Sequence, residues 1–132
     1  MRAARYPAPA YCGVVSLDTG QDWVPDACTL PAAGQRARVV EFGELFSEAT
    51  LGLERPEPTR LRLHLRPGQR SAARAAELAA AETACCSFFT FTLIAVAGSL
   101  VLDVAVPAAQ LATLDALADH AAASIAAASE AR

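Results

Sequence analysis

Residues 59–66 carry the clearest hydrophobic pattern in the chain, because apolar and polar side chains alternate there without a break. Successive side chains of a β-strand point to opposite faces, so the alternation predicts a strand with one buried and one polar face. We interpret the polar face as the water-exposed side of an antiparallel sheet, with an anion-binding or partner-docking face as the alternative. His64 is in addition a potential metal ligand. The expected buried residues are Leu61, Leu63 and Leu65, and the expected polar residues are Arg60, Arg62, His64 and Arg66.

A helical pattern precedes this strand. Apolar residues recur every three or four positions from Val39 to Leu53, which predicts a helix that ends before Pro56 and Pro58. Residues 31–38 are expected to form a loop of basic character. The glutamates of the helix lie on its other, solvated side: Glu41, Glu44 and Glu48.

A second helix is predicted from Ala72 to Cys86, where alanine, leucine, glutamate and arginine dominate. Pro67 and Gly68 mark a turn before it, and Ser71 is the expected N-cap. One stripe of this helix consists of Ala75, Leu78, Ala79 and Glu82, which places the carboxylate on the buried side. A buried carboxylate needs a partner or a function. The alternative is a rotated helix with Glu82 in water.

The last third of the chain predicts a hairpin and a helix. Residues 89–96 and 100–106 read as two strands joined by a turn at Gly98, with Asp103 pointing away from the core. The final helix is expected to begin at Pro107 and to leave His120 solvated. Its predicted apolar face consists of Leu111, Leu114, Leu117 and Ala118.

Together these elements predict an α+β fold, a two-layer sandwich with about three helices on a mixed or antiparallel sheet of four to five strands. Residues 26–128 are expected to form a single domain that includes a short strand over residues 26–30, and residues 1–25 an irregular N-terminal arm. The arm contains a further short segment of strand character, Tyr11 to Leu17.

Composition narrows the class of protein. Of the 132 residues, 54% are apolar and 19% charged, enough for a folded core, and a net charge of −3 argues against a general nucleic-acid-binding surface. The apolar run 84–97 is shorter than a membrane-spanning helix, and Asp103 interrupts its continuation. Because no long apolar segment follows Met1, we expect a cytoplasmic protein with reduced thiols and no membrane partner.

Adjacent cysteines provide the most distinctive chemistry. Glu82 precedes Cys85 by three residues and Cys86 by four, so a helix that continues to Cys86 projects all three side chains from one face. Vicinal cysteines rarely bond to each other because the backbone between them would be strained. Two thiolates side by side favour a soft centre such as Cu(I), Zn(II), mercury or arsenic. The simpler interpretation is that both cysteines are small buried hydrophobic residues.

The remaining cysteines extend this hypothesis. Cys28 can join the pair if its strand runs beside the end of the second helix, and Cys12 on the arm is a potential fourth thiol. The chain lacks a C-x-x-C motif and histidines at ligand spacing, which argues against a closed tetrahedral zinc site.

Two other classes of function stay open. In a small enzyme, Cys85 would be the nucleophile or redox thiol and Glu82 the acid or base, with Arg62 or His64 orienting a small-molecule substrate. A negative neighbour and the end of a helix both oppose a thiolate there unless an arginine compensates. In a dimeric interaction module, the cysteines would be structural.

The cysteine segments resemble those of a group of short, mostly actinobacterial proteins that occur alone or beside mercury-responsive regulators. The first shared segment is Ala-Cys-Thr-Leu, here residues 27–30. The second is Glu-x-x-Cys-Cys-x-Phe-x-x-Phe, here residues 82–91, with Ser87 where the group often has proline. The resemblance covers roughly Asp26 to Leu117, and the residue types are also similar to organomercurial lyase sites, which use two cysteines and an acidic residue.

The resemblance implies soft-metal handling by Cys28, Cys85 and Cys86. We therefore expect a protein that binds a thiophilic metal or metalloid ion, with mercury as the expected ion and resistance or sensing as the expected role. Glu82 would be a neighbouring or proton-handling group. No other cofactor is expected, and a homodimer is compatible with the apolar helix faces.

Overall fold

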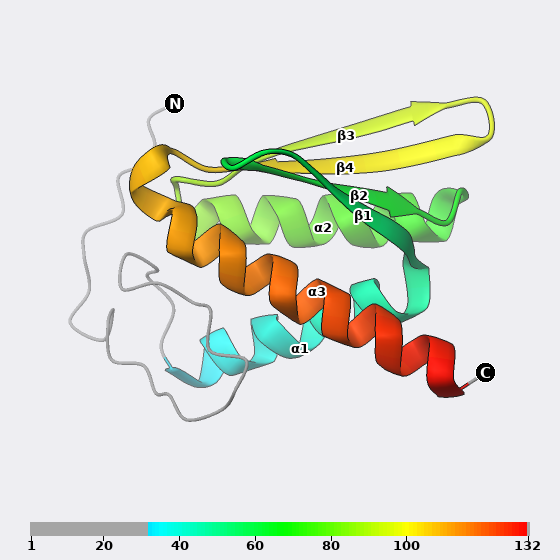
Figure 1. Cartoon of the computed structure of the whole chain (residues 1–132), viewed down its shortest axis with the longest axis horizontal. Helices are drawn as coiled ribbons and strands as arrows, with labels where there is room; N and C mark the ends of the chain where they lie inside the picture. The colour runs from blue at the N-terminus through cyan, green and yellow to red at the C-terminus, as the bar shows by residue number, and fades with distance from the viewer. Residues whose placement is uncertain (1–31, 132) are drawn as a thin grey trace.

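The structure is a computed structural model that describes residues 32–131. Three α-helices and a four-stranded antiparallel sheet make up this part of the chain, which confirms the predicted α+β class (Figure 1). The predicted arm, the predicted strand 26–30, Cys12 and Cys28 lie outside the described residues. The elements in order are α1 (Ala32–Ala49), β1 (Thr50–Glu57), β2 (Arg60–Leu65), α2 (Gln69–Cys85), β3 (Thr90–Val96), β4 (Ser99–Ala105), the short 3-10 helix η1 (Ala108–Gln110) and α3 (Leu111–Ala131).

The helices and the sheet form two layers. The strand order is β1-β2-β4-β3, and every neighbouring pair is antiparallel. Figure 1 shows all three helices on the same side of the sheet, with α2 beneath the strands and α3 crossing α1. The other side of the sheet carries no helix among the described residues. A sheet covered on one face requires alternating polarity along its strands.

The alternation in β2 has the predicted consequence. Leu61, Leu63 and Leu65 are buried against the helices, and the polar residues between them are only partly buried. β4 repeats the pattern with Leu100, Leu102 and Val104. The hairpin β3–β4 is also confirmed, with Gly98 at a φ of 75° in its turn. The helices complete the core with Phe42, Leu45, Phe46, Leu114 and Leu117.

The first helix differs from its prediction at both ends. It begins at Ala32, so residues 32–38 are helical rather than a basic loop, in keeping with the helix propensity of alanine, glutamine and arginine. It ends at Ala49, and Thr50–Glu57 forms β1 instead of the last helical turn. Pairing with β2 outweighs the local helical spacing. Pro56 is tolerated because β1 is an edge strand whose register shifts between Glu54 and Glu57.

The second helix also differs in detail. Gly68, at a φ of 134°, precedes its first turn, so Ser71 is a buried helical residue and not the N-cap. Its last helical residue is Cys85 rather than Cys86. The backbone of Cys86 is no longer helical, but its N–H still donates to the Glu82 carbonyl at 2.7 Å.

His120 on α3 is buried, so the prediction that it is solvated is wrong. Its Nε2 lies 3.2 Å from the carbonyl oxygen of Val39. Its ring packs edge-on against the ring of Phe46, with the two ring centroids 5.3 Å apart. The reason is that α3 packs against α1, and this contact buries the side of α3 that carries His120. The alanine-rich sequence of α3 has too weak a polarity pattern to show which side is buried. No helix within residues 32–131 combines the length and apolar character needed to cross a membrane.

Candidate metal centre

Glu82, Cys85 and Cys86 meet at the C-terminal end of α2. One ligand atom from each, a carboxylate oxygen and two sulfurs, lies within 4.8 Å of the others, and all three residues are buried. Helical spacing brings Glu82 and Cys85 to one face, and the backbone hydrogen bond from Cys86 to Glu82 keeps the next residue beside them. The prediction that Glu82 faces inward is confirmed. The three side chains form a buried group that can hold a metal ion.

Arg38 of α1 completes this group, although it lies in the segment predicted to be a loop. Its Nη1 donates to Glu82 Oε1 at 2.8 Å and lies 3.7 Å from Cys85 Sγ. Its Nε faces Glu41 Oε1 at 3.4 Å, at the rim of the site. Extending the helical pattern N-terminally from Val39 would have exposed the signal, since Arg38 precedes the buried Phe42 by one helical turn.

The charges of the site are coupled. Burial raises the pKa of Glu82, against the opposing effects of hydrogen bonds from the Cys86 thiol and from Arg38. Burial lowers the pKa of Arg38, but the hydrogen bond and charge of Glu82 outweigh this effect, so the net pKa is raised. The guanidinium is therefore the cation that keeps a buried carboxylate in place.

Two aromatic residues, Phe88 and Phe89, follow the cysteine pair in the next loop. Phe89 is buried, its N–H donates to the Cys86 carbonyl at 3.3 Å, and its ring lies 4.7 Å from that of Phe88. Cys85 Sγ contacts the Ala81 carbonyl oxygen at 3.5 Å. Water is largely excluded from such surroundings, so electrostatic interactions at the sulfurs are stronger than at the surface. The same burial also fits the simpler interpretation of two hydrophobic cysteines.

A groove between α1 and α2 reaches Arg38 from outside. Its volume is about 430 Å³, and Arg38 and Ala81, which also contact the buried group, form part of its lining. Three glutamates and two arginines line it, which makes its formal charge negative. A cation in this groove therefore meets a favourable potential. The lining residues are Arg38, Glu41, Glu44, Arg74, Glu77, Leu78 and Ala81.

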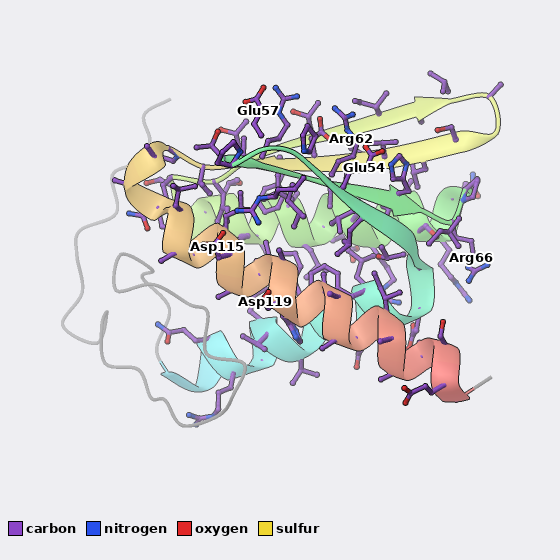
Figure 2. All side chains as sticks on the ribbon, in the orientation of Figure 1. Glu54, Glu57, Arg62, Arg66, Asp115 and Asp119 are labelled. Carbon is purple, nitrogen blue, oxygen red and sulfur yellow. The ribbon has the colours of Figure 1, made fainter. Side chains whose placement is uncertain are left out.

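The polar face of β2 lies on the opposite side of the sheet from this site. Figure 2 shows Glu57 and Arg62 above the strands, away from the helices. Arg62 Nε lies 2.8 Å from Asp103 Oδ1, and His64 Nε2 lies 3.4 Å from Glu54 Oε1. Arg60, Arg62 and His64 therefore do not reach the cysteines, and the arginines are paired with carboxylates, as on a water-exposed sheet face.

Arg66 follows the end of β2 and does not belong to this face. Its Nε donates to the Glu48 carbonyl at 3.4 Å, which ties the strand end to the end of α1. Arg66 therefore takes no part in the polar network of the sheet.

Comparison of the chain with known protein families, with curated protein sequences and with solved structures finds no match.

Proposed function

We propose that this protein binds a soft, thiophilic metal ion at Glu82, Cys85 and Cys86, with Cys28 as a third thiol. The observation that carries the proposal is the convergence of two buried sulfurs and a buried carboxylate within 4.8 Å. Thiolates select soft ions, and few sulfur ligands with restricted water access suit low coordination numbers. Mercury is the ion favoured by the resemblance of the cysteine segments, and resistance or sensing is the corresponding role.

The charge of the group favours a divalent ion. Two thiolates and a carboxylate carry three negative charges, and a divalent cation leaves one. Arg38, at 2.8 Å from Glu82, cancels that charge. Since net charge is expensive to bury, a site of two thiolates, an ionised Glu82 and Arg38 is balanced for a divalent ion.

The length of chain before α1 allows Cys28 to take part. Arg38 lies six residues after Ala32, about 9 Å along the helix axis. Cys28 precedes Ala32 by four residues, which span up to about 14 Å when extended. The linking segment is therefore long enough to span the distance along α1 to Arg38, whose side chain contacts Glu82 and Cys85. If Cys28 adds a third thiolate, Glu82 becomes a group that hydrogen-bonds the ligands instead of binding the ion.

Native mass spectrometry under reducing conditions tests the proposal. Titration with Cd(II) and Hg(II) should give a one-to-one complex and a sulfur-to-metal charge-transfer band. Cys85→Ser and Cys86→Ser should each abolish the tight complex, Cys28→Ser should weaken it, and Cys12→Ser is the matched control that should leave it intact. Absence of a complex, or a complex unchanged in the Cys85 and Cys86 variants, would rule out this function.

A second candidate is a small enzyme that acts on a compound in the groove. The raised pKa of Glu82 favours it, because upward shifts of this kind, caused by burial, are typical of carboxyl groups that act in general acid–base catalysis. Arg38 takes the place proposed for Arg62 or His64, which lie on the far side of the sheet. Alkylation of Cys85 measured against pH distinguishes the two, since an enzyme nucleophile should react faster than a free thiol at neutral pH.

A further inference from the structure

Among residues 32–131, no strand pairs with the outer edge of β3. β3 is the last strand in the order β1-β2-β4-β3, and within residues 32–131 it pairs with β4 alone. Alternate N–H and C=O groups along its other side point away from the sheet. The seven residues Thr90–Val96 contain no charged residue, no proline and no glycine. An edge of this composition is a template for another strand.

The opposite edge of the sheet is built differently. β1 contains Glu54, Arg55, Pro56 and Glu57, and its register with β2 is irregular at two places. Arg55 Nη2 is also held by Asp115 of α3, 2.6 Å away. Charges, proline and irregular register are the features that prevent edge-to-edge pairing. β3 has none of them, so only one edge of this sheet is suited to accept a strand.

We infer that β3 pairs with β3 of a second copy of this chain, to give a continuous eight-stranded antiparallel sheet. An open edge requires a strand as its occupant, and a second copy supplies the same strand by twofold symmetry. Because β3 is uncharged, the symmetric contact brings no like charges together. The pairing also covers apolar surface, since Ile94 is 41% exposed and Val96 62% exposed.

The side-chain pattern selects the register. In an antiparallel pair, directly opposed side chains point to the same face, so the copies keep their helices on one side only when the sum of opposed residue numbers is even. Pairing centred on Leu93 meets this condition and aligns all seven residues. Leu93 then faces its counterpart, Phe91 faces Ala95, and Thr92 faces Ile94. The half-buried Phe91 and Leu93 border the core of each copy and would join the two cores.

Sedimentation velocity of the full-length chain at micromolar concentration tests this interface, independently of the metal site. The wild type should be a dimer. Thr92→Lys and Ile94→Glu should each weaken the dimer about tenfold or more, because the charge has no partner across the new strand pair. The double variant should recover dimerisation, since this register places the introduced lysine opposite the glutamate of the other copy twice per dimer.

Leu51→Glu is the matched control. Leu51 is 56% exposed on the opposite edge strand, so the same kind of charge there should leave the dimer intact. Thr92 and Ile94 are exposed, and unchanged circular dichroism verifies that their variants fold. A monomeric wild type, single variants that dimerise normally, or a double variant that stays monomeric would overturn the proposal. Hydrogen-exchange protection of the β3 edge in a monomer would mean that another part of the same chain covers the edge, and would overturn the proposal too.

Discussion

The buried pair Arg38–Glu82 and the partly buried pair Arg62–Asp103, on the polar face of the sheet, have the same chemistry and the same shortest distance, 2.8 Å. Their surroundings differ. The side chains of Arg38 and Glu82 are 15% and 2% exposed between two helices, whereas those of Arg62 and Asp103 are 31% and 12% exposed on the open face of the sheet. Water can replace a lost partner at the surface but not in the interior. Burial, and not distance, therefore decides what each ion pair contributes to the stability of the protein.

The two clusters also differ in how many partners share the charge. On the sheet, Asp103 is within ion-pair distance of Arg60 and Arg62, and Glu54 faces Arg62 and His64. Asp103, Glu54 and Arg62 therefore each have a second partner. Arg38 in contrast spans from the rim carboxylate of Glu41 to the buried carboxylate and a sulfur. Among the described residues, Glu82 therefore has Arg38 as its single cationic partner.

The largest expected effect is the loss of Arg38. Arg38→Met should lower the free energy of unfolding by about 3–5 kcal/mol, because the Glu82 carboxylate stays buried without its cation. Urea denaturation measures the change. Arg62→Met is the matched control and should cost much less. Adding Glu82→Gln to Arg38→Met should recover most of the loss, and equal losses for Arg38→Met and Arg62→Met would contradict the comparison.

Metal binding should act on the buried cluster alone. With Cd(II) at about 100 times its dissociation constant, the folded state should gain about 2.7 kcal/mol. Thermal unfolding with and without the metal measures this gain, and a chelator should reverse it. The gain should disappear in Cys86→Ser and persist in Glu54→Gln, which removes a carboxylate from the exposed cluster. Stabilisation that persists in Cys86→Ser would place the ion elsewhere.

His120 extends the comparison to a buried group that faces a backbone carbonyl instead of a charge. Burial lowers its pKa below the ordinary value of 6.5. Between the folded-state pKa and pH 6.5, the unfolded chain binds more protons at His120 than the folded chain does. The contribution of neutral His120 to the free energy of unfolding is therefore fully present above pH 6.5, and it is lost as pH falls through the folded-state pKa. Urea denaturation of wild type and His120→Gln should show this slope in the wild type alone. The same slope in both would assign it to other groups.

The smallest effect concerns salt. The exposed cluster should be screened in 1 M NaCl, where the Debye length is about 3 Å, so the small loss in Arg62→Met should shrink further. The loss in Arg38→Met should change little, because the desolvation of Glu82 does not depend on mobile ions. Denaturation in urea at low and high salt checks both. A salt-sensitive Arg38→Met would mean that water reaches the buried pair.

Local periodicity alone determined several features of this protein. Strict alternation predicts β2 and its buried leucines, and Gly98 predicts the hairpin turn. The spacing of Glu82, Cys85 and Cys86 predicts that the three side chains converge. All these features depend on residues within one or two turns of each other, where backbone geometry by itself sets the direction of a side chain.

Only the tertiary structure decided which groups meet across elements. Arg38 joins Glu82 from 44 positions away, and His120 meets Val39 from 81 positions away. The buried faces of alanine-rich helices cannot be recognised from sequence, because the polarity pattern of these helices is too weak. Thr50–Glu57 is a strand because it pairs with β2 through backbone hydrogen bonds, which the spacing of its own apolar residues does not predict. The sequence of a segment limits which of its faces can be buried. The packing of α1 against α2 decides which face is buried, and it places the charge of Arg38 beside Glu82 and Cys85.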